Sequence, residues 1–459
     1  MKKLGNPLKK SFELNNPLNY FNGNFYFGAG LYDLPVTRFN YTKPFKNGIF
    51  EGFANGNYQR AYVRNSDRYS LSGGANLSYF ISNDASFLSG TQFKLHSKYG
   101  FSSYKFFASN TPQAKRTLGL GDLSLSVNNI RSKNFLFASK LSDNYYSISQ
   151  ESFAENFVQV YGMMKLAFTT FNIGTDINYK LQSLKNIIGN NLNYNFLKMH
   201  PQIGVNIGKN IKAEFGFLYA EAGTNNFLAP TASIAFRVNK DISFFGEYSP
   251  DVDFYGSGYF LTENRYFNTQ NFKNLFFSKP TNLKITIKYE YQTFFEIDAG
   301  LQIFSSKYIP YFTSSLQSGK FDVVTTSGRS GDAFVNFLFY FGPYGSLFST
   351  AEFYDSRDTS GNILPYYPRG RISLNYSYAF KNGLTTEVKL AYNSGSYTNI
   401  SNTNKLNPFI NLGLNFIYKL KHNFDLTLRF SNLLNHNNYI WMGYKEIPFN
   451  AVAGFRYHW

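Results

Sequence analysis

The sequence predicts an all-β protein whose strands close into an antiparallel transmembrane β-barrel of about 22 strands. Three observations lead to this prediction. Apolar and polar residues alternate over long segments, short and long connections alternate along the chain, and aromatic residues make up 20% of the 459 residues. Together they indicate strands with one apolar and one polar face, which is the pattern of a sheet that separates lipid from water.

Alternation with a period of two is clearest between residues 284 and 304. Apolar or aromatic residues occupy every second position there, and a turn at Gln292-Thr293 separates the two halves of this hairpin. Similar alternation recurs near the C-terminus. The residues predicted to contact lipid are Ile285, Ile287, Tyr289, Ile297, Leu301, Leu412, Leu426 and Leu428. The residues predicted to line the lumen are Lys288, Glu290, Glu296, Asp298 and Arg429.

Strand length favours a barrel over a soluble sheet. Strands in soluble proteins average about 5–6 residues, whereas about 9–11 tilted residues are needed to cross a membrane. The alternating segments match the longer class. A sheet can span lipid only when it closes on itself, because an open edge would leave backbone groups without hydrogen bonds.

Short and long connections alternate along the chain, as is typical of outer-membrane barrels with short periplasmic turns and long extracellular loops. Short turns are predicted at residues 82–84, 169–170, 208–210, 239–241, 342–345, 381–383 and 421–423. Long loops are predicted at residues 250–280, 305–331, 355–368 and 432–446. Counting back from the C-terminus gives about 21 strands, the first of them near Asn24. An even total requires one more strand, for which residues 9–20 are a weak candidate.

Composition agrees with a barrel and excludes several kinds of site. The chain contains 51 Phe, 37 Tyr and 2 Trp, although only 43% of its residues are hydrophobic. So many aromatic side chains exclude a disordered chain, and many of them suit the two membrane interfaces. The modest hydrophobic fraction fits strands of which every second residue faces lipid. The absence of cysteine excludes disulfide bonds, thiolate zinc sites, iron–sulfur clusters and cysteine nucleophiles.

No transmembrane helix is predicted. The longest uncharged stretches, residues 14–32 and 333–351, contain Pro and Gly where a spanning helix must be unbroken. The basic start of the chain is not followed by the apolar run of a signal peptide. The sequence therefore leaves open whether an export signal has been removed.

The C-terminal segment resembles the last strands of TonB-dependent receptor barrels. The resemblance rests on the PRGR segment from Pro368, the NLLN segment from Asn432 followed by Tyr439, the Gly443-Tyr444 loop with Pro448, and an aromatic terminal strand. It implies a Gram-negative outer-membrane barrel that transports a bulky solute. Phe455, Tyr457 and Trp459 likewise resemble the terminal signal by which the barrel-assembly machinery recognises such proteins.

One departure from that family affects the functional expectation. TonB-dependent receptors carry a plug domain and an energy-coupling box before the barrel, whereas strands are predicted here almost from the start. Residues 1–459 are therefore expected to form a single barrel domain without a plug, and active uptake does not carry over. A plug supplied upstream or by a partner protein stays possible. The long loops at 250–280 and 305–331 are the candidates for covering so wide a mouth.

No catalytic, cofactor or metal site is predicted, and the chain is not expected to be an enzyme. Its five His are dispersed, and it has no paired-His metal motif or phosphate-binding loop. The net charge of +17 is spread over the chain instead of forming a dense basic stripe, so no nucleic-acid partner is expected. Several basic residues fall in or beside predicted periplasmic turns, where they either meet anionic lipid headgroups or solvate the turns. They are Lys43, Lys46, Arg131, Lys133, Lys209, Lys212, Lys240, Lys381, Lys419 and Lys421.

Three functional hypotheses remain. The first is an outer-membrane transport barrel, and the second is a scaffold barrel that holds partner proteins of the envelope. The third is a soluble all-β adhesin or solenoid, which the lack of a fixed-length repeat disfavours. For the first two, the expected partners are outer-membrane lipids, lipopolysaccharide and the barrel-assembly machinery.

Overall fold

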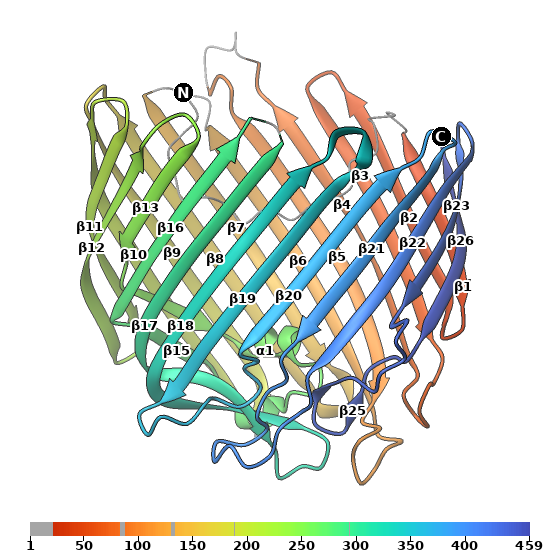
Figure 1. Ribbon diagram of the computed structural model, residues 1–459. Coiled ribbons are helices and arrows are strands. Elements are labelled where there is room, and N and C mark those ends of the chain that lie inside the picture. The colour runs from red at the N-terminus through yellow and green to blue at the C-terminus, as the bar shows by residue number, and fades with distance from the viewer. Residues whose placement is uncertain (1–21, 83–87, 130–133, 188, 293) are drawn as a thin grey trace.

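The computed structural model is a closed β-barrel. It describes residues 22–82, 88–129, 134–187, 189–292 and 294–459. Within these ranges, 22 strands form one sheet in which the paired strands are antiparallel (Figure 1). The last strand, β26 (Asn450–His458), pairs with the first, β1 (Gly23–Gly30), and this pairing closes the ring. The predicted fold class is confirmed.

The strands between β1 and β26 follow one another around the ring. They are β2 (Asp33–Phe45), β3 (Gly48–Gln59), β4 (Arg68–Phe80), β5 (Gln92–Lys105), β6 (Lys115–Asn129), β7 (Phe135–Ile148), β8 (Phe153–Ala167), β9 (Phe171–Ile187), β10 (Asn190–Ile207), β11 (Ile211–Ala222), β12 (Asn225–Arg237), β13 (Ile242–Tyr248), β16 (Thr281–Tyr291), β17 (Phe295–Ser314), β18 (Phe321–Tyr340), β19 (Ser346–Asp358), β20 (Gly370–Ala379), β21 (Leu384–Asn393), β22 (Phe409–Lys421) and β23 (Phe424–Ser431).

The remaining elements are short and do not belong to the ring of 22 strands. They are β14 (Asp251–Tyr255), β15 (Leu275–Lys279), β24 (Tyr439–Trp441), β25 (Tyr444–Lys445), the helix α1 (Ser257–Glu263) and the 3₁₀ turns η1 (Ser149–Glu151), η2 (Thr269–Asn271) and η3 (Gly342–Tyr344). No helix in the described residues is long and apolar enough to cross a membrane.

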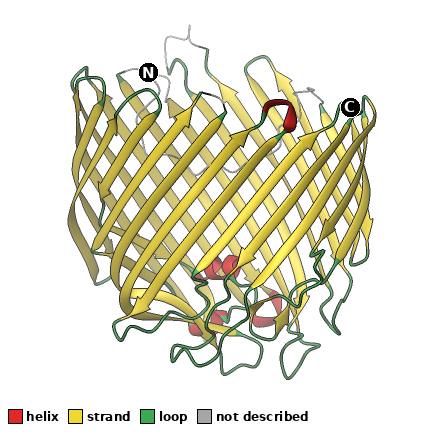
Figure 2. Ribbon diagram, in the orientation of Figure 1, coloured by secondary structure: helices red, strands yellow, loops and turns green. Residues whose placement is uncertain are grey.

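The two ends of the barrel differ. At one end, where β1 begins and β26 finishes, most of the connections between strands are short, and we call it the turn end. At the other, which we call the loop end, several connections are long and carry α1, η1 and η2, whereas η3 lies at the turn end (Figure 2). In outer-membrane barrels the short turns face the periplasm and the long loops face outward. Three connections at the loop end are nevertheless short, namely those after β1, β9 and β11.

The predicted total of about 22 strands is confirmed, although the count of about 21 from Asn24 is one too few, and one predicted loop is wrong. The 22 strands all lie between Gly23 and His458, and the candidate strand at residues 9–20 lies outside the described residues. Residues 305–331, predicted as a long loop, mostly extend β17 and β18, whose actual connection is only residues 315–320. The pairing register of these strands shifts between Ser306 and Ile309. This bulge moves the inward-facing positions from even-numbered to odd-numbered residues. The alternation in the sequence is therefore interrupted, although the strand continues.

The outer surface of the barrel is apolar. Among the residues predicted to contact lipid, Ile285, Ile287, Leu301, Leu426 and Leu428 keep between 38% and 48% of their surface exposed, and the other three are partly buried. Leu301 lies opposite Ile285 on one neighbouring strand and opposite Ala333 on the other. Such a surface is stable only in contact with lipid, which agrees with an outer-membrane location.

The two faces of β17 give a direct test of this orientation. We expect Leu301→Arg to destabilise the folded barrel by about 2–4 kcal/mol, the cost of an Arg that faces lipid near the bilayer midplane. Gln302→Arg should cost much less, because Gln302 lies on the opposite face, where its side chain bonds to Asn282. Urea unfolding in lipid vesicles measures both values. Equal costs at the two positions would show that the assigned faces are wrong.

Candidate functional site

The connection between β13 and β16 folds across the loop end of the barrel. We call residues 249–280 the inner cap. The cap starts and finishes as a small antiparallel hairpin of β14 and β15, and it carries α1 and η2 between them. In Figure 1 the helix α1 lies within the outline of the barrel at its loop end. The segment was predicted as a long loop and as a candidate cover for the mouth.

Apolar packing joins the cap to opposite parts of the wall. Phe260, Leu261 and Phe267 are at most 3% exposed and belong to one buried cluster. This cluster also contains apolar side chains from two separate groups of strands. The wall residues are Leu118, Ile148, Phe153, Leu184 and Ile187 from β6 to β9, and Ile309 and Val323 from β17 and β18. The cap therefore bridges the lumen between these two groups.

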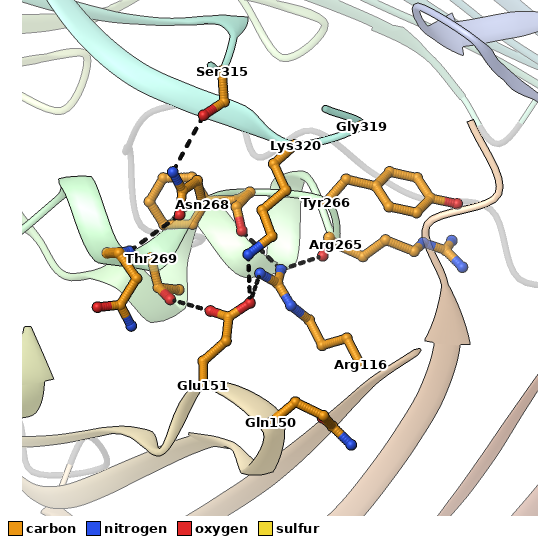
Figure 3. Close-up of polar contacts among 12 residues, drawn as sticks. Arg116, Gln150, Glu151, Arg265, Tyr266, Asn268, Thr269, Ser315, Gly319 and Lys320 are labelled. Atoms are coloured by element: carbon orange, nitrogen blue, oxygen red, sulfur yellow. Dashed lines mark hydrogen bonds and ion pairs between the residues drawn. The ribbon is translucent and has the colours of Figure 1, made fainter. Parts of the chain in front are cut away.

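Three charged side chains connect the cap to its surroundings, and we call them the latch: Arg116, Glu151 and Lys320 (Figure 3). The carboxylate of Glu151 lies 2.5 Å from the guanidinium of Arg116 and 2.8 Å from the ammonium of Lys320. Arg116 also donates hydrogen bonds to two cap carbonyls, at 2.7 Å to Phe267 and 3.0 Å to Arg265. The latch thus links β6, η1 and the β17–β18 connection to the cap.

Burial makes the latch energetically important. The Arg116 side chain is 1% exposed, and those of Glu151 and Lys320 are 14% and 16% exposed. Burial alone would raise the pKa of Glu151, but Arg116 and Lys320 outweigh it and hold that pKa below its ordinary value. The second carboxylate oxygen of Glu151 accepts a hydrogen bond from Thr269 of the cap at 2.9 Å. Glu151 is therefore charged at neutral pH and bonded on both oxygens.

A second buried carboxylate holds the start of α1. Glu155 on β8 is 1% exposed, and its two oxygens accept hydrogen bonds from the backbone N–H groups of Ser257 at 3.1 Å and Gly258 at 2.6 Å. Gln182 donates to the same carboxylate at 2.6 Å. A Cβ atom on Gly256 would lie 1.9 Å from it, so this close approach requires glycine at that position.

Two further loops pack on the cap. The ring of Tyr266 stacks on that of Tyr444 from the β23–β26 connection, with centroids 3.5 Å apart, and the Tyr444 hydroxyl donates to the carbonyl of Gly319 at 2.6 Å. Asn268 of the cap donates to Asp322 of β18 at 2.9 Å. The cap is therefore held by side chains from several parts of the loop end.

The lumen side of the cap is lined by pockets. Tyr259, Thr262 and Glu263 of α1 border a pocket of about 320 Å³, and Glu263 also borders two others of about 260 and 360 Å³. Along β7 to β9, the lining residues of the first pocket extend towards the turn end as far as Asn144 and Lys180, beyond the level of the residues buried under the cap. This first pocket therefore faces the lumen.

Four of the five predicted lumen residues lie together on β16 and β17. The ammonium of Lys288 is 3.1 Å from Glu296 and 3.5 Å from Glu290, and Asp298 accepts a hydrogen bond from Asn336 at 3.3 Å. Arg429 lies apart on β23, with its guanidinium 3.7 Å from Asp33. Whether these five residues contact a solute stays a prediction.

The predicted terminal signal lies at the junction of β26 and β1. Phe455 packs on Phe27 with ring centroids 5.9 Å apart, and Tyr457 packs on Trp459 at the same centroid distance. Tyr457 is 44% exposed on the outer face. Its role in recognition by the assembly machinery stays a prediction.

The three latch residues, and Glu155 at the start of α1, were not among the predicted site residues. One signal for them exists in the sequence. Leu118, Ile148 and Leu184 occupy inward positions near the loop end, where a water-filled lumen would favour polar residues. Apolar residues at inward positions indicate a segment packed inside the barrel. Within the described residues, no group of three acidic or His side chains could hold a metal ion.

Comparison with known proteins identifies the fold. No protein-family model and no curated protein sequence matches the chain. Among solved structures, the complex of FpvAI with pyocin S2 matches with a TM-score of 0.70 at 11% identity, over 97% of this chain and 74% of that chain. The siderophore receptor PirA from Acinetobacter baumannii matches with a TM-score of 0.70 at 10% identity, over 97% and 81% of the two chains. The FrpB iron transporter from Neisseria meningitidis matches with a TM-score of 0.70 at 11% identity, over 96% and 82%.

These matches agree with the resemblance found in the C-terminal segment, and at such low identity they show the fold alone. The closed ring, its apolar outer face and its structural neighbours lead to one conclusion: the chain is an outer-membrane β-barrel with the fold of the TonB-dependent siderophore receptors.

Proposed function

We propose that the barrel is a passage for a bulky solute across the outer membrane and that its own inner cap closes it. The observation that carries this proposal is the cap itself, which bridges the lumen between two parts of the wall. Outer-membrane transporters with 22 strands have a plugged lumen, because an open barrel of that width would leak. Here a single connection of the barrel domain supplies the obstruction.

The pockets beneath the cap suggest the size of the solute. Three of them meet at Glu263 and have volumes of about 260 to 360 Å³ each. Such volumes are typical of sites for organic ligands and much larger than a hydrated ion needs. A solute that occupies this space would be expelled or admitted when the cap moves.

Replacing the cap tests the proposal. Tyr248 at the end of β13 lies opposite Leu283 on β16, so residues 250–280 can be replaced by an Asn-Gly hairpin turn without breaking the ring. We expect the variant to remain heat-resistant, since the ring pairings are kept. In planar bilayers it should conduct as a wide pore, whereas the intact protein should stay closed.

A matched control changes another loop at the same end. Residues 359–362 are the first part of the β19–β20 connection, outside the cap, and shortening them should leave the barrel closed. An intact protein that already conducts as a wide pore would show that the cap does not close it. If neither the intact nor the cap-replaced protein conducts, transport is contradicted and the scaffold hypothesis is favoured.

A further inference from the structure

One of the pockets under the cap contains charged groups that do not pair with one another. It has a volume of about 260 Å³ and lies between the cap, the start of β4 and the β23–β26 connection. We call it the arginine pocket. Its charged lining includes Arg68 from β4, Arg265 from the cap and Glu446 from the β23–β26 connection.

In the described part of the chain, these three side chains make no hydrogen bond and no ion pair. By contrast, Lys105 on the border of the same pocket is paired with Asp67 at 2.8 Å. Burial raises the pKa of Glu446, while the nearby charges of Arg265 and Arg68 act against that rise. The three groups are therefore close enough to influence one another and still leave a gap between them.

The charge balance of the gap is positive. Two guanidinium groups face the carboxylate of Glu446, while Glu263 and Lys445, which also line the pocket, carry opposite charges that offset each other, so one positive charge is uncompensated. Guanidinium presents a planar fork of N–H donors that matches the oxygens of a carboxylate or a phosphate. A single anionic group between Arg68 and Arg265 would balance this charge and accept hydrogen bonds from guanidinium donors that have no hydrogen-bond partner among the described residues.

Aromatic rings form the other walls. Tyr62, Phe107 and Tyr266 meet edge to face, with ring centroids 6.4 Å apart for Tyr62 and Phe107 and 6.5 Å apart for Phe107 and Tyr266. Trp441 also lines the pocket. The Tyr62 hydroxyl is fixed by a 2.6 Å hydrogen bond to the carbonyl of Lys445. Such walls favour a planar ring beside the anionic group.

The pocket opens towards the lumen. Arg68 also lines an adjoining pocket of about 510 Å³, whose other wall residues include Asn55, Ser70 and Ser72. In the strand register Arg68 lies opposite Gln59, and Ser72 lies opposite Asn55, further towards the turn end. A solute in the lumen can therefore reach the two arginines without crossing the cap.

We propose that the arginine pocket binds a solute that carries a carboxylate or phosphate group on an aromatic ring, with the anionic group between Arg68 and Arg265. This inference rests on the proposed function in one respect: the bound molecule belongs to the class of solute that passes through the lumen. The site itself is defined by the unpaired charges and the rings around them.

Binding of phenyl phosphate to the purified barrel, measured by isothermal titration at fixed low salt, tests the proposal. Phenyl phosphate should bind more tightly than inorganic phosphate, which lacks the ring, and more tightly than phenol, which lacks the charge. Benzoate distinguishes a carboxylate site from a phosphate site. Equal affinity for phenyl phosphate and phenol, or no binding of either phenyl phosphate or benzoate, would overturn the inference.

One substitution is expected to weaken binding of the probe and another to strengthen it, which a general loss of structure could not produce. Arg265→Gln should weaken binding roughly ten- to hundredfold, the loss expected for hydrogen bonds to a charged group. Its side chain is exposed and makes no hydrogen bond in the described chain, so the fold should be unaffected. Glu446→Gln should strengthen binding, because it removes the competing negative charge. Arg68→Gln is a second variant on the other side of the gap.

Arg64→Gln is the matched control, since Arg64 is exposed in the same β3–β4 connection but does not line the pocket. Weakening by Glu446→Gln, or unchanged binding in both Arg265→Gln and Arg68→Gln, would overturn the site. So would an equal loss in Arg64→Gln, because it would indicate unspecific attraction of anions. Because the cap replacement removes Arg265, binding is measured on the intact barrel. An intact barrel that does not bind these probes, although its cap-replaced form conducts, contradicts the pocket alone, whereas binding by an intact barrel whose cap-replaced form never conducts contradicts the proposed transport alone.

Discussion

Glu151→Ala is expected to release the inner cap and convert a closed barrel into a conducting one. The substitution leaves Arg116, which is 1% exposed, and Lys320 without their shared carboxylate. Removing one partner of a buried ion pair costs about 3–5 kcal/mol, because the remaining charge stays buried and unpaired. That cost falls on the closed arrangement of the cap, since Arg116 can regain water only when the cap carbonyls move away from it.

The measurement is single-channel conductance in planar bilayers, with heat-resistant migration in gels as evidence that the ring is intact. Gln150→Ala is the matched control, because Gln150 is the neighbouring residue in η1 and bonds to Thr117 of β6 instead of the cap. It should leave the barrel closed. A Glu151→Ala protein that stays as closed as the control would show that the latch does not hold the cap.

The same latch gives the intact protein a defined response to acid. The ordinary pKa of a Glu such as Glu151 is 4.5, and the two cations hold the folded value below it. The charged carboxylate of Glu151 therefore stabilises the closed cap fully above pH 4.5, and this stabilisation is lost as the pH falls through the pKa of Glu151 in the folded protein. The intact barrel should open in that acidic range, whereas the conductance of Glu151→Ala should not change there.

The sequence was sufficient for the barrel because lipid imposes a simple pattern on it. Each strand must turn one face to lipid, so a period of two is visible wherever the strands are regular, as from Ile285 to Tyr291. The number of strands and most turns follow from that period. The pattern fails where a bulge shifts it, which is why the sequence predicts a loop where β17 in fact continues beyond Ser306.

The cap could not be predicted in the same way, since no period governs it. Its latch joins residues that are 35 and 169 positions apart, and nothing in their local sequence pairs them. The arginine pocket likewise depends on three segments that only the closed fold brings together. The sequence contains only indirect evidence for the cap. Apolar residues such as Leu184 occupy inward positions, where contact with water would be unfavourable.

Contacts between side chains hold the cap in place, whereas backbone hydrogen bonds of one strand close the ring. β26 pairs with β23 on one side and with β1 on the other. At its end, the N–H of Trp459 donates to the carbonyl of Gly23 at 3.2 Å, and the N–H of Gly23 donates back at 3.1 Å. The indole ring of Trp459 covers Gly23 so closely that a Cβ there would lie 2.5 Å from it.

Deleting residues 457–459 is therefore expected to abolish assembly. The truncated chain loses the pairing of Tyr457 with both Phe25 and Phe424, which leaves backbone groups without partners in lipid, where each costs several kcal/mol. It also loses two of the three aromatic residues proposed to be recognised by the barrel-assembly machinery. We expect no heat-resistant protein in the outer-membrane fraction.

Trp459→Phe is the matched control for that deletion, because it keeps the backbone pairing with Gly23 and an aromatic ring at the terminus. It should assemble and migrate as a heat-resistant barrel. If the truncated chain also reached the outer membrane in heat-resistant form, closure would not depend on the end of β26, and Phe455 with the remaining ladder to β1 would have to be sufficient for both recognition and closure.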